Sequence, residues 1–177
     1  MGLEVLINCI AENSKHISSK LKEGSSPAPL ELQRSARLPV LAALLKEFDR
    51  PVVLLTDRMD HALTLVEEMG LLAPNLNLKL FPEPEPLFFE DAPWSDTTRL
   101  DRLLAITELA SYHQDGLEVV KKPPLIIAPV RAIMVRTVHK DDFIKNSRFL
   151  EAKHEIIFDE FITGCIYLGY ENVTTVV

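Results

Sequence analysis

The sequence predicts an α/β fold with a mostly parallel sheet and helices on both faces. Two short runs, Pro51–Leu55 and Leu125–Ala128, have the length and the lack of polar residues that buried parallel strands need. Amphipathic stretches of helical period separate the strand candidates, as crossover connections between parallel strands require. With 177 residues, 47% of them hydrophobic, the chain can bury one sizeable core.

The first part of the chain is expected to alternate helix, strand and helix. A helix over residues 3–23 has apolar positions near a period of 3.6 and ends at the linker Gly24–Pro27. A short strand over Pro29–Gln33 leads into a helix over residues 36–48. Pro39 lies in the first turn of that helix, where proline is tolerated.

The alternation continues beyond the strand at Pro51–Leu55. Thr56 or Asp57 is expected to cap the next helix, which Gly70 and Pro74 end. The later elements are expected to be a strand over 76–81, a helix capped by Ser95 that runs to about residue 112, the strand at 125–128, short helices at 130–138 and 141–146, an extended stretch at 148–157, a helix over 158–168 and a β-rich end at 170–177.

The stretch Leu30–Arg37 has the position of a phosphate-binding loop but not its residues. It follows a strand candidate and opens an amphipathic helix. A working loop needs glycines to let its backbone N–H groups wrap the phosphates, a lysine for the terminal phosphates and a Ser or Thr for the metal. This degenerate loop instead holds Glu31, Gln33, Arg34, Ser35 and Arg37.

The carboxylate of Glu31 would repel a phosphate by about 1–4 kcal/mol in a partly desolvated site. A Cβ at the former glycines would also block close approach of the backbone. We therefore predict that this chain binds no cofactor, holds no metal, has no catalytic residue and is not an enzyme.

The degenerate loop keeps one feature that attracts anions. Arg34, Ser35 and Arg37 lie at a predicted helix N-terminus, where free N–H groups favour negative charge. The hypothesis is a weak sulfate or phosphate site there. The alternative is a solvent-exposed helix start with no ligand.

Composition argues against several classes of protein. A net charge of −7 disfavours tight nucleic-acid binding by this chain alone. No apolar run approaches the roughly 20 residues of a membrane span, so no membrane contact is expected. Cys9 and Cys165 lie far apart and fit free thiols in a reducing cytosol, so the expected localisation is cytoplasmic. The five histidines have no paired spacing with cysteines or carboxylates, so zinc is not expected.

The loop Phe81–Trp94 holds four prolines, four carboxylates and four aromatic residues. Its carboxylates could be read as paired groups for acid and base catalysis. We expect instead that the loop packs its aromatic side chains onto the sheet and exposes its acids. Phe88, Phe89 and Trp94 form a candidate patch for binding a partner.

Four short motifs resemble a known family. The loop F-P-x-x-E-x-L-x-F-E at residues 81–90 resembles the F-P-x-x-E-x-L-P-Y-E segment of bacterial transcription-repair coupling factors, the Mfd family. Three further segments are similar to that family in the same order, namely Arg102-Leu103 on the following helix, Ala128-Pro129-Val130-Arg131-Ala132 after a strand, and G-Y-x-x-V-x-x-V at 169–176. Together they cover about residues 30–177.

The resemblance implies that the chain is the N-terminal UvrB-like module of such a factor. It would comprise a degenerate RecA-type α/β domain and the beginning of a second small domain. The family's first loop, G-L-T-G-S-A-K-A, aligns here with Glu31 and Arg34 at the glycines and Arg37 at the lysine. The chain therefore departs even from a loop that is already degenerate.

The parent protein implied by the resemblance is an ATP-dependent DNA translocase that removes stalled RNA polymerase and recruits the damage sensor UvrA. Its motor domains, which use ATP and Mg²⁺, and its contacts with RNA polymerase and DNA would lie outside this chain. The family's G-x-F-x-x-R-G stretch is absent as well. We therefore expect a truncated module that contacts other domains of the parent and binds UvrA weakly or incompletely.

These expectations divide the chain into an N-terminal helix and linker at 1–28, a RecA-like domain at 29–146 and a truncated second domain at 147–177. The expected function is that of a non-catalytic interaction module. The alternative is a stand-alone α/β domain that binds a nucleotide or another small molecule at the carboxyl ends of its strands. Saturable binding of ATP or ADP would favour that alternative.

Overall fold

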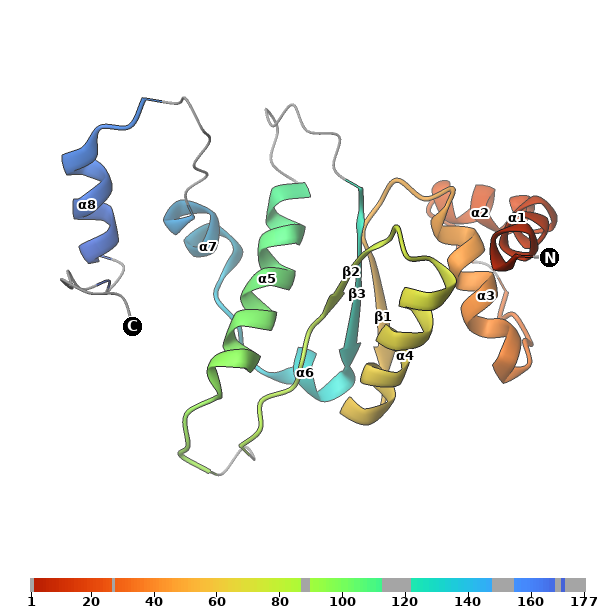
Figure 1. Cartoon of the computed structure of the whole chain (residues 1–177), viewed down its shortest axis with the longest axis horizontal. Coiled ribbons are helices and arrows are strands. Elements are labelled where there is room, and N and C mark those ends of the chain that lie inside the picture. The colour runs from red at the N-terminus through yellow and green to blue at the C-terminus, as the bar shows by residue number, and fades with distance from the viewer. Residues whose placement is uncertain are drawn as a thin grey trace. The chain divides into compact units, whose positions relative to one another are not determined.

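The protein is described by a computed structural model that covers residues 2–26, 28–86, 90–112, 122–147, 155–167 and 170. The chain divides into two compact units, Met1–Arg136 and Thr137–Val177. The elements of the first unit are α1 (Leu3–Asn13), α2 (Lys15–Lys22), α3 (Arg34–Leu45), β1 (Val52–Thr56), α4 (Met59–Leu72), β2 (Asn77–Leu80), α5 (Asp96–Tyr112), β3 (Pro124–Pro129) and α6 (Val130–Met134) (Figure 1). The second unit contains α7 (Lys140–Asn146) and α8 (Phe158–Tyr167).

The first unit is built on a parallel three-stranded sheet with the order β1-β3-β2. Strand β3 lies in the centre, pairs with both neighbours and is buried at every residue. The chain passes from β1 through α4 to the far edge and returns through α5 to the centre. Because both crossovers are expected to be right-handed, the reversal of direction puts α4 and α5 on opposite faces.

Each face of the sheet has its own apolar core. Leu125 and Ile127 point to one face, where they pack with residues of α1, α3 and α4, among them Ile7. Ile126 and Ala128 point to the other face and pack with Phe81 and with alanines of α5 and α6. Burying one such isoleucine or leucine contributes about 1.5–3 kcal/mol. The predicted α/β fold, with a parallel sheet and helices on both faces, is confirmed.

Several expected elements differ in detail. The strand expected over Pro29–Gln33 does not form: these residues have no sheet partner among those described, and the N–H of Leu32 bonds to the nearby C=O of Leu30 at 2.7 Å. The helix expected over 3–23 is two helices, because it breaks at Ser14, whose N–H bonds to the last turn of α1. Helix α4 continues through Gly70 and ends at Leu72.

The remaining expectations fall in two groups. Strands β1, β2 and β3 and helices α3, α5, α6, α7 and α8 lie within a few residues of their predicted positions. The extended stretch expected over 148–157 and the β-rich end expected over 170–177 lie largely outside the described residues. None of the described helices is both long enough and apolar enough to cross a membrane.

Candidate functional site

The carboxyl ends of the three parallel strands lie along one edge of the sheet, where α/β proteins commonly bind their ligands. In Figure 1 the turn from β1 into α4 and the loop that follows β2 leave the sheet at this edge, whereas α3 begins toward the same end of the unit but to the side of the sheet. Helix α3 begins toward this end of the unit because residues 46–51 lead the chain from the last turn of α3 to the beginning of β1.

The degenerate loop therefore lies toward the end of the unit where a phosphate loop would be expected, but the described residues before it form no strand. Helix α3 begins at Arg34, and its N-cap residue Gln33 makes no side-chain bond to the helix. Arg34, Ser35 and Arg37 are all exposed. The guanidinium of Arg37 reaches back to the C=O of Leu32, with an Nε–O distance of 3.5 Å. The weak anion site stays a prediction.

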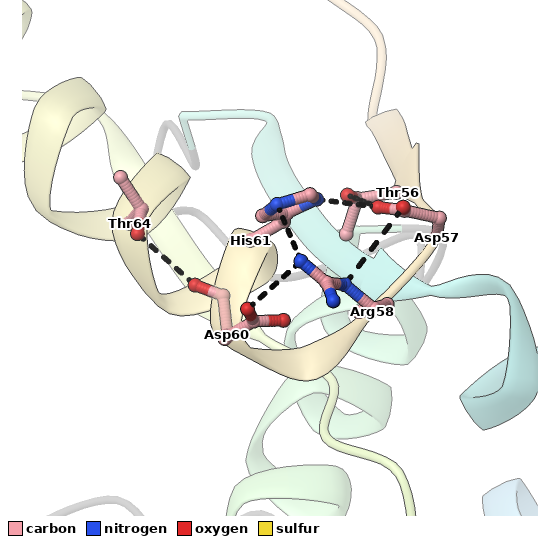
Figure 2. A network of polar contacts seen from close by, with 6 residues as sticks. All are labelled: Thr56, Asp57, Arg58, Asp60, His61 and Thr64. Carbon is pink, nitrogen blue, oxygen red and sulfur yellow. Dashed lines mark hydrogen bonds and ion pairs between the residues drawn. The ribbon is translucent and has the colours of Figure 1, made fainter.

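The turn from β1 into α4 carries a network of polar side chains, drawn in Figure 2. The imidazole Nδ1 of His61 lies 2.6 Å from Oδ1 of Asp57, and its Nε2 lies 3.0 Å from Nη2 of Arg58. The same Nη2 forms an ion pair with Asp60 at 3.2 Å, and Thr56 donates to Asp57. The bond from His61 lowers the pKa of Asp57.

The partners of the two ring nitrogens indicate which nitrogen of His61 carries the proton. An arginine can only donate, so Nε2 of His61 must accept, and the ring proton must lie on Nδ1, where it is donated to Asp57. Both ring nitrogens of the neutral imidazole are then occupied. In this arrangement His61 offers no free lone pair to a metal or to a substrate proton.

This network corrects two predictions. His61 does have paired spacing with a carboxylate, since Asp57 lies four residues earlier, on the turn that leads into the helix. The residue at the N-cap of α4 is Arg58, without a side-chain cap bond, rather than Thr56 or Asp57. The Asp-x-x-x-His spacing at a strand-to-helix turn was the signal that could have revealed the pair.

The loop after β2 is held by a buried arginine of α5. Arg102 is 3% exposed, and its Nη1 donates to the C=O of Pro82 at 2.8 Å and to the C=O of Ala132 at 3.2 Å. Its guanidinium carbon lies 4.0 Å from the ring centre of Phe81 and 5.1 Å from that of Trp94. Arg102 thereby joins the loop, α5 and α6. Nη2 of Arg102 is buried and has no hydrogen-bond partner among the described residues.

Glu85 connects the same loop to the N-terminus of α5. Its carboxylate accepts a short hydrogen bond from the hydroxyl of Ser95 and a bond of 2.6 Å from the hydroxyl of Thr98. Ser95 in turn caps the helix, because its Oγ accepts from the N–H of Thr98 at 3.2 Å. The bonds from Ser95 and then Thr98 lower the pKa of Glu85 to about 2. The predicted cap at Ser95 is confirmed.

A second arginine holds the loop from α6. Nη2 of Arg131 donates to the C=O of Pro86 at 3.1 Å, and its Nε lies 3.9 Å from a carboxylate oxygen of Glu83. Phe81, Pro82, Glu85, Arg102 and Arg131 thus form one assembly, which we call the loop clamp. Three of the four motifs singled out in the sequence contribute residues to it, and the fourth, at 169–176, lies largely outside the described residues.

The loop clamp bears on the two interpretations of the proline-rich loop. Phe81 packs into the core as expected. Glu85 is exposed, but its carboxylate accepts hydrogen bonds from hydroxyl groups at the N-terminal end of α5. Trp94, from the candidate partner patch, is half-buried against Arg102. Phe88 and Phe89 lie outside the described residues. Within the described part of the chain, no group of three or more His, Cys, Asp or Glu side chains is placed to bind a metal ion.

The structure is thus a parallel α/β domain in which arginines of α5 and α6 hold the loop that follows β2, at the carboxyl ends of the strands. No family model matches the chain. The chain is similar to the transcription-repair-coupling factor of Bacillus subtilis (strain 168), with 28% identity over 164 residues. That match covers 92% of this chain and 13% of the relative, so the chain spans about an eighth of the relative's length. No solved structure matches.

Proposed function

We propose that this chain is the non-catalytic, UvrB-like interaction module of a transcription-repair coupling factor. In the parent protein it would help to recruit UvrA when RNA polymerase has stalled. The observation that carries this proposal is the similarity to the Bacillus subtilis factor, because it extends over 92% of the chain rather than over one motif.

The loop clamp supports the same proposal. Residues from three of the four motifs that resemble this family, Phe81, Glu85, Arg102 and Arg131, contact one another or the same short loop. Chance motifs in an unrelated fold would not be expected to meet in one place. The contacts of the clamp join the loop to α5 and α6, which supports a role in building the scaffold.

The start of α3 supports a module without a nucleotide. A phosphate loop positions its backbone N–H groups by leaving a strand and turning tightly at glycines. The described residues before α3 form no strand, and Glu31 and Arg34 stand at the positions where the resembled loop has glycines. The RecA-like ancestry of the sheet is part of this proposal, as are the ATP and Mg²⁺ that the motor domains of the parent would use.

Exposed leucines on α5 are consistent with an interaction role. Leu100, Leu103 and Leu104 are 56%, 47% and 46% exposed, and they lie on the side of the helix away from Arg102. Apolar strips of this kind are typical of surfaces that other proteins cover. Their position allows both roles proposed here: contact with other domains of the parent and contact with UvrA.

The proposal is tested by immobilising the chain and titrating UvrA from the same organism. We expect weak, saturable binding, with a dissociation constant on the order of micromolar or above. Free chain in solution should compete for UvrA, which distinguishes specific binding from adsorption. No saturable binding, or binding that free chain does not reduce, would contradict the proposal.

A nucleotide titration separates this function from that of a stand-alone nucleotide-binding domain. Ligand at one hundred times its dissociation constant stabilises a fold by about 2.7 kcal/mol, which raises the melting temperature of a chain of this size by roughly 5–10 °C. We expect no such rise with ATP or ADP and Mg²⁺. A saturable rise that Arg37→Ala abolishes would favour the alternative.

A further inference from the structure

A groove of about 510 Å³ lies at the amino ends of β2 and β3, the end opposite the loop clamp. We call it the amino-end groove. Its walls come from α1, from the last turns of α3 and α4, and from the chain segments that enter β2 and β3. All of these elements belong to the first unit, and the groove serves none of the contacts described above.

The amino-end groove has a largely apolar lining with a few polar and charged side chains. Ile7 and Leu125, each 1% exposed, line it and belong to the larger core. Leu3 and Leu71 line it as well but are 53% and 75% exposed, so packing within the chain leaves much of their surface in water. A volume of about 510 Å³ falls within the range of small-molecule sites, roughly 300–1,000 Å³.

Two lysines give the groove a local positive charge. Nζ of Lys46 donates to the side-chain oxygen of Asn8 at 2.6 Å, and Nζ of Lys122 donates to the C=O of Asn75 at 3.3 Å. Among the residues that the structure describes, neither ammonium lies within ion-pair distance of a carboxylate. Since an ammonium has three N–H donors, both lysines retain donors for a ligand.

The charged side chains that line the groove favour a ligand with a negative charge. Glu4 is the acidic residue that lines the groove, so the lining carries one negative and two positive charges in a chain whose net charge is −7. A compact anionic group would pair with the lysines, while the body of the ligand would have to be apolar to replace water along the leucines. A nucleotide or a sugar would leave polar groups unpaired against this lining.

We propose that the amino-end groove binds an elongated apolar molecule with one carboxylate, of the fatty-acid class. The apolar chain lies along Leu3, Ile7, Leu71 and Leu125, and the carboxylate meets Lys46 and Lys122. This site is independent of UvrA binding and of the function proposed for the carboxyl edge.

The probe is dodecanoate, added below its micelle concentration to the full ¹⁵N-labelled chain. Amide shifts should move saturably at Leu71, Asn75 and Leu125, with a dissociation constant on the order of 10–100 µM. Dodecyltrimethylammonium has the same chain with the opposite charge and should bind at least about tenfold more weakly.

Variants locate the site. Lys46→Glu combined with Lys122→Glu should weaken dodecanoate about tenfold or more, and Leu71→Asp should abolish saturable binding. The matched controls are Lys20→Glu, an exposed lysine of α2, and Leu63→Asp, an exposed leucine of α4 outside the groove; both should bind as the unchanged chain does. Melting curves establish that each variant is folded.

Four results would overturn the proposal: no saturable shifts at the groove, equal binding of the cationic amphiphile, equal loss in the control variants, or occupation of the groove by an acidic amphipathic peptide but not by dodecanoate. If the lysine variant fails to fold, the comparison of the two amphiphiles on the unchanged chain decides, because it needs no substitution.

Discussion

Replacing Arg102 by methionine tests the loop clamp most sharply. Methionine keeps an unbranched apolar side chain in the same place but removes both bonds to buried backbone oxygens. Pro82 and Ala132 are buried, so their C=O groups would be left without this donor and without ready access to water. The contacts of the guanidinium with Phe81 and Trp94 would also be lost.

The expected change in the free energy of unfolding is the loss of two hydrogen bonds, partly offset by the removal of a buried charge. Two hydrogen bonds from a charged donor contribute about 1.5–3 kcal/mol each, or roughly 3–6 kcal/mol together. Removing the cation offsets part of this loss, about 1–3 kcal/mol, because burial disfavours the charge and Nη2 has no partner among the described residues. The net prediction is a loss of about 2–3 kcal/mol in the free energy of unfolding, or roughly 4–12 °C in melting temperature.

Urea unfolding of Arg102→Met and Arg99→Met provides the assay. Arg99 lies on the same helix, is exposed and pairs only with Asp96 among the contacts described, at 2.7 Å, so its replacement should cost less than about 1 kcal/mol. Arg102→Lys should fall between the two, since one ammonium cannot reproduce the fork. If Arg102→Met is as stable as Arg99→Met, the clamp does not hold the loop.

The remaining predictions concern the cap, the acid response and the core. Ser95→Ala should cost about 1 kcal/mol in the free energy of unfolding, because α5 loses its N-cap, whereas Ser19→Ala on the exposed face of α2 should change little. The pKa of Glu85 is about 2 in the fold, below its ordinary value of 4.5, so its stabilising effect is complete above that ordinary value and is lost as the pH falls toward 2. Glu85→Gln should therefore flatten this part of the profile of unfolding free energy against pH, and an unchanged profile would contradict the role given to Glu85. Leu125→Ala should cost about 2–5 kcal/mol, and Leu55→Ala on the neighbouring strand, where the side chain is 52% exposed, less than about 1 kcal/mol, as measured by urea unfolding.

The strands could be predicted from the sequence because a strand that is buried on both faces is a short run of uncharged, mostly apolar residues. Val52–Thr56 and Pro124–Pro129 read as short runs without charges, and the helices between them have apolar positions at helical spacing. The strand expected at Pro29–Gln33 was wrong because two leucines and a proline resemble a strand locally, while its existence depends on a partner strand that the sequence does not specify.

The candidate site was harder to predict because it depends on contacts that cross the chain. An arginine among leucines in α5 looks like a surface residue, and its burial depends on Pro82, twenty residues earlier, and Ala132, thirty residues later. The short-range pair Asp57 and His61 could have been found from its spacing. The amino-end groove has no local signal in the sequence, since its walls come from four separate segments.

The most direct measurement of the central claim follows the amide signals of ¹⁵N-labelled chain after addition of UvrA and, in a second sample, of ATP with Mg²⁺. UvrA should broaden the signals of the Met1–Arg136 unit, because a 20.0 kDa chain then tumbles as part of a much larger complex. ATP with Mg²⁺ should not change the amide chemical shifts of Glu31 to Arg37. Saturable shifts of those amides with nucleotide, together with no response to UvrA, would contradict the central claim.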